Sequence, residues 1–362
     1  MKIGVLGSGQ LGRMLALSAY PLGHQMSFLA SSEEDPSSLL GNTFIQNGSQ
    51  EIIEEFAKNS DVVTYESENT DISLVKEISQ KTMVYPSAKP LYISQHRIRE
   101  KSLFDKLNIP CAPYHMVNSL SELKIAVEKI GLPAILKTAT DGYDGKGQFL
   151  IQSDSQLDQA WKSMSGVESI LEGFINFKRE LSLVAVRGID NTHKYYPLVE
   201  NSHHNGILRL TIAPAQNISS KLQQQAESYM RSLLDEMNHV GVLTIELFET
   251  DNNLVVNEMA PRVHNSGHWT IEGAHTSQFE NHIRAITETS LGDTSFTHKY
   301  NAMINIIGEQ GPIEKVLTLK NAHLHLYNKT EREGRKLGHI TITANTVYDL
   351  NTSLETLSDF MP

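Results

Sequence analysis

The fold is decided first by Lys2-Ile3-Gly4-Val5-Leu6-Gly7-Ser8-Gly9-Gln10-Leu11-Gly12. Its apolar half predicts a buried strand, and the glycines that follow predict a tight turn into a helix. The same alternation continues further along the chain. More strands are predicted at Met26–Leu29, Val62–Tyr65 and Thr82–Val84, and helices at Leu11–Leu22 and Ile52–Ala57. Because strands joined by helices pair in parallel with right-handed crossovers, residues 1–95 are expected to form a Rossmann-like parallel α/β domain.

The spacing of Gly7, Gly9 and Gly12 between strand and helix is typical of a dinucleotide cradle. A nicotinamide site also needs an acid near the end of the second strand to hold the ribose hydroxyls. That strand ends at Ser31, and the nearest acid, Glu33, comes late. Dinucleotide binding is therefore disfavoured, and a dehydrogenase is kept only as an alternative from another class. Two other interpretations stay open: an anion held by the helix N-terminus, and a turn without a ligand.

Beyond residue 95 the predicted strands and helices no longer alternate regularly. Helices are predicted at Gln95–Leu107, Leu120–Ile130 and Lys221–Asn238. Strands are predicted at Ala134–Lys137, Gln148–Ile151, Glu168–Phe174, Glu180–Arg187, Lys194–Val199, Val242–Phe248, Leu254–Glu258, Ala302–Ile307 and His323–Tyr327. We therefore expect an α/β fold (α+β overall) with three domains, at 1–95, 96–300 and a small β-rich 301–362.

Composition narrows the class of protein. The chain has 362 residues, of which 40% are hydrophobic, and a net charge of −11. The charge argues against general binding to nucleic acid or to anionic membranes. A single cysteine, Cys111, excludes an internal disulfide, and no apolar run is long enough to span a bilayer. Since the sequence also shows no signal-peptide pattern, we expect a cytoplasmic protein.

The most informative stretch for chemistry is Asn257-Glu258-Met259-Ala260-Pro261-Arg262-Val263-His264-Asn265-Ser266-Gly267-His268. An earlier acid, Glu246, lies in the preceding apolar segment. Two carboxylates near an amide indicate a hard cation, for which magnesium with phosphate oxygens is the usual case. The arginine, histidine and asparagine that follow are donors suited to a small oxyanion. A metal end beside an anion end predicts phosphoryl transfer from a nucleotide.

Magnesium binding requires Glu246 and Glu258 to lie on the same side of the 242–258 hairpin. A three-residue turn, Asp251–Asn253, would place these two residues opposite each other. A two-residue turn, Asp251-Asn252, would instead place Asn257 opposite Glu246, and a bulge would then be needed. The sequence leaves both registers open.

Three further segments have nucleotide-binding chemistry. Lys137 ends an apolar strand, and the glycine-rich loop Asp141–Gln148 follows it, although the loop lacks P-loop spacing. Such a loop lets backbone amides approach phosphates and can close as a lid. Strand Leu171–Ile175 offers an edge for adenine and a carboxylate, Glu172, for ribose. A basic cluster, Lys329 to Lys336, is either a solvated face or a loop able to wrap a phosphate.

Taken in order, these segments resemble the ATP-grasp superfamily and, within it, the 5-(carboxyamino)imidazole ribonucleotide synthetase family of purine biosynthesis. The motifs that carry the resemblance are Gly7–Gly12 with Arg13-Met14, Thr64–Glu68, Gly142–Gln148, Glu172–Ile175, Asn257–His268, and Tyr327–Lys329 leading to Gly334–His339. The resemblance implies an ATP-grasp fold with a lid subdomain near residues 110–170. One departure is visible, because Val263 stands where the family pattern has proline.

The resemblance also implies roles for individual residues. ATP would contact Arg97, Lys137, Gly142, Tyr143, Asp144, Gly145, Lys146, Gly147, Gln148, Glu172, Gly173, Phe174, Ile175, Glu180, His203, Asn257 and Glu258. Magnesium would bind Glu246 and Glu258. Bicarbonate and carboxyphosphate would bind Arg262, His264 and Asn265. The aminoimidazole ribotide would contact Glu66, Tyr143, Asp144, Lys146, Lys329 and Arg335.

The implied activity is that of an ATP-dependent carbon–nitrogen ligase. Bicarbonate would be activated by ATP as carboxyphosphate and would carboxylate the exocyclic amine of 5-aminoimidazole ribonucleotide, releasing ADP and phosphate. Asp144 is the candidate acceptor of the amine proton. The resemblance also implies a homodimer. The nearest alternatives are other ATP-grasp ligases, such as a formate-dependent glycinamide ribonucleotide transformylase or a biotin-carboxylase-like enzyme.

Overall fold

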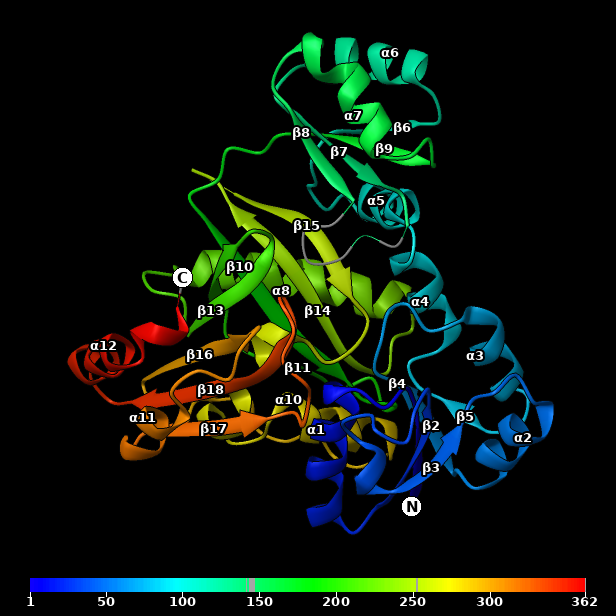
Figure 1. The fold of residues 1–362 in the computed structure, drawn as a ribbon, viewed down its shortest axis with the longest axis vertical. Coiled ribbons are helices and arrows are strands. Elements are labelled where there is room, and N and C mark those ends of the chain that lie inside the picture. The colour runs from blue at the N-terminus through cyan, green and yellow to red at the C-terminus, as the bar shows by residue number, and fades with distance from the viewer. Residues whose placement is uncertain (141, 143–146, 252, 362) are drawn as a thin grey trace.

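The computed structural model describes residues 1–140, 142, 147–251 and 253–361 (Figure 1). The N-terminal part contains a five-stranded parallel sheet in the order β3-β2-β1-β4-β5. Its strands are β1 (Lys2–Leu6), β2 (Gln25–Ala30), β3 (Asn42–Ile45), β4 (Val62–Tyr65) and β5 (Met83–Val84), and its helices are α1 (Gln10–Ala19), α2 (Gln50–Lys58) and α3 (Ile72–Ile78). The predicted α/β unit is confirmed. The edge strand β3 was missed, because it is only half-buried and begins with polar residues.

A second, four-stranded antiparallel sheet stands apart at the top of Figure 1, with strand order β6-β9-β7-β8. Helices α4 (Ala88–Ser94) and α5 (Arg97–Lys106) lead to it from the N-terminal sheet. Its elements are β6 (Tyr114–Val117), α6 (Leu120–Ile130), β7 (Ala134–Thr138), β8 (Gln148–Ile151), α7 (Leu157–Ser163) and β9 (Ser169–Gly173). Leu123 and Ala126 of α6 pack with Leu136 and Leu171 of the sheet, so this unit has its own small core.

The third sheet has nine strands and joins the middle of the chain to its C-terminal part, with β15-β14-β10-β12-β13-β16-β18-β17 in sequence and β11 against β10. Its first strands are β10 (Arg179–Arg187), β11 (His193–Tyr195), β12 (Val199–His204), β13 (Ile207–Ala213), β14 (Gly241–Glu249) and β15 (Leu254–Ala260). The others are β16 (Tyr300–Ile307), β17 (Ala322–Leu326) and β18 (Lys336–Ala344). The remaining helices are α8 (Ser220–Glu236), α9 (Thr270–Gly273), α10 (Gln278–Ile286), α11 (Ile313–Thr318) and α12 (Val347–Thr356).

Sequence and structure differ at three places in this sheet. The predicted strand Lys194–Val199 is wrong as a single element, because β11 ends at Tyr195 and β12 begins at Val199. Pro197 lies in the gap, and proline has no N–H for the strand ladder. Strands β13 and β18 were not predicted.

The large sheet is covered on both faces. Along β10, Leu181 and Leu183 pack in one core with Met230 of α8, whereas Val184 packs in another with Phe279 of α10. This alternation fixes the face of each residue on the neighbouring strand β14. Residues 243, 245 and 247 of β14 belong to the α8 side, so Glu246 points to the other side. Among the described residues, no helix is long and apolar enough to cross a membrane.

Candidate active site

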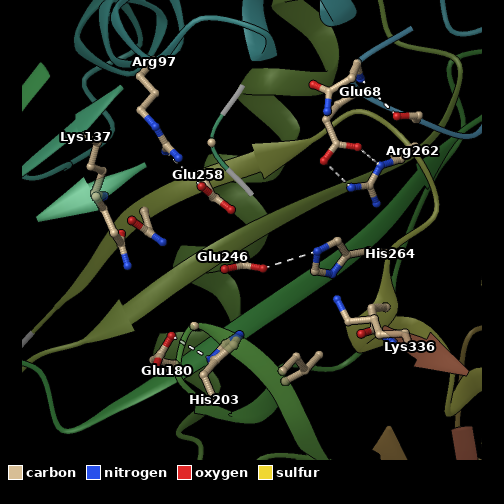
Figure 2. Close-up of a pocket in the computed structure, with 18 of the residues that line it drawn as sticks. Glu68, Arg97, Lys137, Glu180, His203, Glu246, Glu258, Arg262, His264 and Lys336 are labelled. Carbon is tan, nitrogen blue, oxygen red and sulfur yellow. Dashed lines mark hydrogen bonds and ion pairs between the residues drawn. The ribbon is translucent and has the colours of Figure 1, made fainter. Parts of the chain in front are cut away.

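A cavity of about 640 Å³ lies between the four-stranded sheet, α5 and the nine-stranded sheet (Figure 2). It gathers side chains that are far apart in the sequence, from the glycine loop to the run after β15. The predicted site residues that line it are Arg97, Lys137, Gly142, Gln148, Glu180, His203, Glu246, Asn257, Glu258, Arg262, His264 and Asn265. Tyr143, Asp144, Gly145 and Lys146 lie outside the described residues.

The two acids expected at a metal are brought together by a bulge. Glu246 of β14 is the Cα partner of Glu258 on β15, whereas the next pair towards the turn is Leu247 with Val256. Asn257 is therefore the extra residue. The Thr250 N–H donates to the Asn253 carbonyl at 3.0 Å, which is the register of a two-residue turn. Of the two registers left open by the sequence, the structure has the second, with its bulge.

Each of these acids has a basic side chain as its partner. Arg97 Nη1 donates to Glu258 Oε2 at 3.1 Å, and His264 Nε2 lies 3.3 Å from Glu246 Oε1. Burial alone would raise the pKa of Glu246, but the hydrogen bond and charge of His264, with His203 and Lys336 nearby, lower that pKa to about 2. Glu246 is therefore ionised at neutral pH, as a metal ligand must be.

The donor chemistry fits magnesium. Two carboxylates and the Asn257 side chain line one cavity, and Mg²⁺ prefers oxygen ligands. Among the described residues, no group of three histidine, cysteine or acidic side chains is placed to hold a metal. A magnesium ion at Glu246 and Glu258 would therefore complete its shell with water and phosphate oxygens, which is its usual behaviour.

The strand-end lysine points into the same cavity. Lys137 Nζ donates to Glu172 Oε2 at 2.8 Å, and Lys101 Nζ lies 3.6 Å from Glu172 Oε1. Burial raises the pKa of Glu172, but the charges of Lys137 and Lys101 outweigh burial and lower it to about 2. Because this carboxylate is 3% exposed and paired with two lysines, it is not placed to hold a ribose, as the sequence had suggested. The exposed side chain of Phe174, the half-buried side chain of Ile175 and the backbone of this segment are left for a nucleotide.

Part of the backbone of this segment already has hydrogen-bond partners within the protein. The Gly173 N–H donates to the Pro113 carbonyl and the Phe174 N–H to the Pro133 carbonyl, at 2.8 and 3.1 Å. Ile175 follows at the end of the segment. Two aromatic rings that the sequence did not single out, Phe177 and Phe248, stack 4.6 Å apart and line the cavity.

On the cavity floor in Figure 2, His203 Nδ1 lies 3.0 Å from Glu180 Oε2. Burial lowers the pKa of His203, but Glu180 and Glu246 outweigh burial and the net shift is upward. The pair combines a carboxylate with a ring held in one orientation, which suits hydroxyl recognition.

The anion end is built around Arg262. Its Nη2 donates to Glu68 Oε1 at 2.6 Å, and its Nε donates to the other oxygen of the same carboxylate. Nη1 donates to the Val263 carbonyl at 3.0 Å. Burial would raise the pKa of Glu68, but the charge of Arg262 lowers it to about 2. This fork fixes the guanidinium plane and leaves one N–H on each terminal nitrogen for an anion.

Asn265 and His264 are also held by neighbours. The side-chain amides of Asn265 and Asn305 donate to each other, at 3.0 and 2.7 Å. His264 Nδ1 lies 2.8 Å from Ser266 Oγ, which fixes the ring that faces Glu246. Glu68 and Asn305 were not predicted to have a role. Lys336 was assigned only to the basic cluster, yet it begins β18 and lines the cavity.

The glycine fingerprint holds an internal anion. Glu66 Oε2 accepts the Gly12 N–H at 2.6 Å, and Oε1 accepts the Gly9 N–H. A side chain on Gly7 would meet Glu66 at 2.7 Å, and Gly7 has a φ of +106°. The glycines therefore make room for a carboxylate of the chain itself, where a dinucleotide would place its pyrophosphate. The dinucleotide interpretation is excluded by this contact.

Lys329, one of the described residues predicted to bind the ribotide, lies beside this turn. Lys329 Nζ donates to Gln10 Oε1, and Gln10 lines the cavity. Arg335 Nη1 donates to Thr330 Oγ1 at 2.6 Å. Burial, with the charge of Arg335, lowers the pKa of Lys329 to about 8. Glu66, Lys329 and Arg335 are not part of the described cavity lining, and neither is Gly147.

The fold and the site together define an ATP-grasp enzyme, an ATP-dependent ligase. Residues 102–279 match the ATP-grasp domain, residues 1–95 the ribonucleotide synthetase preATP-grasp domain, and residues 301–353 the phosphoribosylaminoimidazole carboxylase C-terminal domain. The chain is 46% identical to the N5-carboxyaminoimidazole ribonucleotide synthase of Pseudomonas aeruginosa over 94% of each chain. It therefore belongs to the N5-carboxyaminoimidazole ribonucleotide synthase family.

Solved structures agree with this assignment. The N5-carboxyaminoimidazole ribonucleotide synthetase of Thermus thermophilus superposes with a TM-score of 0.95 at 44% identity, covering 99% of this chain and 98% of that one. The Aspergillus clavatus N5-carboxyaminoimidazole synthase, in complex with ADP and 5-aminoimidazole ribonucleotide, superposes with a TM-score of 0.91 at 33% identity, with the same coverage. The likeness thus extends over the whole described fold.

Proposed function

We propose that the cavity in Figure 2 is where this chain carboxylates the exocyclic amine of 5-aminoimidazole ribonucleotide, with ATP and bicarbonate as co-substrates. The product is N5-carboxyaminoimidazole ribonucleotide, an intermediate of purine biosynthesis. The observation that carries the proposal is that two kinds of groups share one cavity. Glu246 and Glu258 line it, and Arg262, His264 and Asn265 line it beside them, with His264 Nε2 3.3 Å from Glu246 Oε1.

The first half-reaction is activation of bicarbonate. Its carbon is a poor electrophile because it bears anionic oxygens, and transfer of the ATP γ-phosphoryl group supplies a leaving group. Magnesium, held by Glu246 and Glu258 with Asn257, would neutralise phosphate charge. Lys137 and Arg97 also line the cavity and add two cations. Catalysis by these residues is mostly positioning and charge neutralisation.

Arg262, His264 and Asn265 are proposed to hold bicarbonate and then carboxyphosphate. The Glu68 fork presents the remaining guanidinium N–H groups in a fixed plane, so little reorganisation is needed when negative charge develops. Lys336 lines the same region and adds a further cation. A buried site of this kind also keeps water from the reactive intermediate.

The two ribose-bearing substrates are assigned to the ends of the site. ATP would place its base against the backbone near Ile175 and its ribose near Glu180 and His203. The ribotide would lie near Glu66, Lys329 and Arg335. Tyr143, Lys146 and the proton acceptor Asp144, which lie outside the described residues, are assigned to the same substrate. We also propose a cytoplasmic homodimer that takes only small-molecule substrates.

One experiment tests the function. ADP release is measured with ATP, magnesium and bicarbonate, with and without 5-aminoimidazole ribonucleotide, and the amount of carbamate product formed is measured in parallel. We expect ADP to be released only when the ribotide is present, in an amount equal to the carbamate formed. Turnover with formate and glycinamide ribonucleotide in its place would establish the transformylase instead. An ADP release rate that neither 5-aminoimidazole ribonucleotide nor glycinamide ribonucleotide changes would refute the proposal.

A further inference from the structure

The edge strand β15 needs hydrogen-bond partners outside its own sheet. Among the described strands it neighbours β14 at the edge of the sheet, and on its other side Val256 bridges Cys111, so its outward backbone groups face α5 and the segment before β6. The Val256 N–H donates to the Pro110 carbonyl at 2.8 Å. At the bulge, Lys101 Nζ donates to the Asn257 carbonyl at 2.8 Å, and Glu100 Oε1 accepts the Met259 N–H at 2.7 Å.

The contacts made by Glu100 and Lys101 come from one face of helix α5. Arg97, Glu100 and Lys101 are three and four residues apart, which places them side by side on α5. Arg97 reaches the side chain of Glu258, while Glu100 and Lys101 reach the backbone on either side of that residue. Helix α5 therefore makes three contacts with Glu258 and the residues on either side of it.

The two backbone contacts are made by ionisable side chains that are almost fully buried. Glu100 is 2% exposed and Lys101 is 1% exposed, among apolar neighbours such as Phe104. Burial, together with the charge of Glu258, raises the pKa of Glu100 to about 8, although Lys101, the Met259 N–H and Arg97 oppose the shift. Apolar residues would fill this helix face at lower cost. The presence of these two buried polar side chains therefore needs a local reason.

The alternative register of the hairpin supplies that reason. Without the bulge, the two-residue turn would place Asn257 opposite Glu246. Side chains alternate along a strand, so Glu258 would then point to the α8 face of the sheet. The residues of β14 on that face are apolar and buried, namely Leu243, Ile245 and Leu247.

A carboxylate turned towards these apolar side chains could not reach the cavity. In the bulged register, by contrast, Glu258 faces the cavity beside Glu246. The contacts of Glu100 and Lys101 with β15 are made in this register, on either side of Glu258. They therefore favour the bulge, which lets both acids meet a cation in a hairpin with a two-residue turn.

We propose that Glu100 and Lys101 are positioning residues that hold β15 in its bulged register and so set Glu258 beside Glu246 for a divalent cation. The inference rests on the proposed function only in assigning magnesium to these two carboxylates. Lys101 also approaches Glu172, the partner of Lys137. The same helix thus links the metal acids to Lys137 through Glu172.

The test uses variants of the full chain that keep side-chain size. Lys101→Met removes the donor to Asn257, and Glu100→Leu removes the acceptor for Met259. Glu100→Gln keeps an acceptor oxygen and is the conservative rescue. Lys106→Met is the matched control, because Lys106 lies on the same helix but pairs with Glu236 at the surface.

The readout is the magnesium concentration that gives half-maximal rate, beside the KM for the ribotide. We expect Lys101→Met and Glu100→Leu to raise the half-saturating magnesium concentration by about tenfold or more. Glu100→Gln and Lys106→Met should stay within about twofold, and the ribotide KM should not change. Half-saturation does not depend on the folded fraction, so a less stable variant still reports it. Wild-type magnesium dependence in Lys101→Met and Glu100→Leu would overturn the proposal.

A second measurement separates this inference from the proposed function. Magnesium-dependent binding of ADP, followed by calorimetry, needs no ribotide and no turnover. If the wild-type protein fails to carboxylate the ribotide but the two variants still weaken magnesium-dependent ADP binding, the function is wrong and the positioning role stands. If carboxylation is normal and the variants bind magnesium and ADP like wild type, the positioning role is wrong.

Discussion

Two regions of this protein look like nucleotide sites in the sequence, and only one of them keeps its polar groups for a ligand. In the β14–β15 hairpin, Glu246 and Glu258 line the cavity with side chains that a cation can reach. In the glycine turn after β1, the N–H groups of Gly9 and Gly12 are already bonded to Glu66. A motif indicates which backbone geometry is possible, whereas the partner of each polar group determines whether a ligand can bind there.

The same comparison explains why the hairpin needs help from outside. The glycine turn is fixed by one carboxylate that follows the adjacent strand β4, which the parallel sheet brings close. With its two-residue turn, the hairpin places both acids towards the cavity only when Asn257 forms the bulge. Contacts from α5 accompany that bulge.

The largest expected effect is at the hairpin. Glu258→Gln should lower kcat/KM by about 100-fold or more, because the amide cannot supply a negative oxygen to magnesium. Steady-state kinetics at several magnesium concentrations would measure it. Asp251→Asn, in the same hairpin but highly exposed, is the control and should be near wild type. Activity of Glu258→Gln within a few-fold of wild type would remove this residue from the metal site.

A substitution at the glycine turn should lower the stability of the protein. Glu66→Gln keeps one acceptor oxygen for two N–H groups at a helix N-terminus, so we expect a loss of about 1–2 kcal/mol in the free energy of unfolding. Urea denaturation would measure it. Glu51→Gln, in the first turn of α2 at the surface, should change stability by less than about 0.5 kcal/mol. Equal stability of Glu66→Gln and wild type would mean that the turn does not depend on this carboxylate.

The basic loop beside the glycine turn should show a pH dependence. Because burial lowers the pKa of Lys329 to about 8, its positive charge is present below that pH and is lost as the pH rises through it. We expect kcat/KM for the ribotide to fall above about pH 8, by up to tenfold per pH unit. Lys329→Arg should keep the charge and flatten this limb of the profile. An identical decline in Lys329→Arg would assign the titration to another group.

Much of the fold could be predicted from local patterns. Strands β1, β2, β4 and β14 have strong apolar runs, and their prediction is confirmed. The break at Pro197 and strand β3 were missed. Pro197 interrupts a stretch that otherwise looks like one strand, and β3 is only half-buried, so a search for apolar runs detects neither feature. The hairpin acids could be named from the sequence, but their register could not, since turn length and bulge are settled by partners elsewhere.

The site residues that sequence reasoning missed share one property. Glu68 acts through Arg262, and Asn305 acts through Asn265, over separations that only the folded chain closes. Lys336 was hidden in a basic cluster that was interpreted as a loop, although the alternating residues after it form β18. Long-range partners of this kind leave no periodic signal in the sequence.

The smallest expected effect is at Val263, where the family pattern has proline. The bond before it is not among the cis peptide bonds of the described chain, and the Val263 N–H donates to no described residue. Proline removes that N–H, restricts the backbone of the unfolded chain and replaces the buried Val263 side chain, so Val263→Pro should leave kcat within about twofold and change the free energy of unfolding by no more than about 1 kcal/mol. Thermal unfolding and steady-state kinetics would measure both. A large loss of activity would show that the loop between Arg262 and His264 needs a backbone angle that proline cannot adopt.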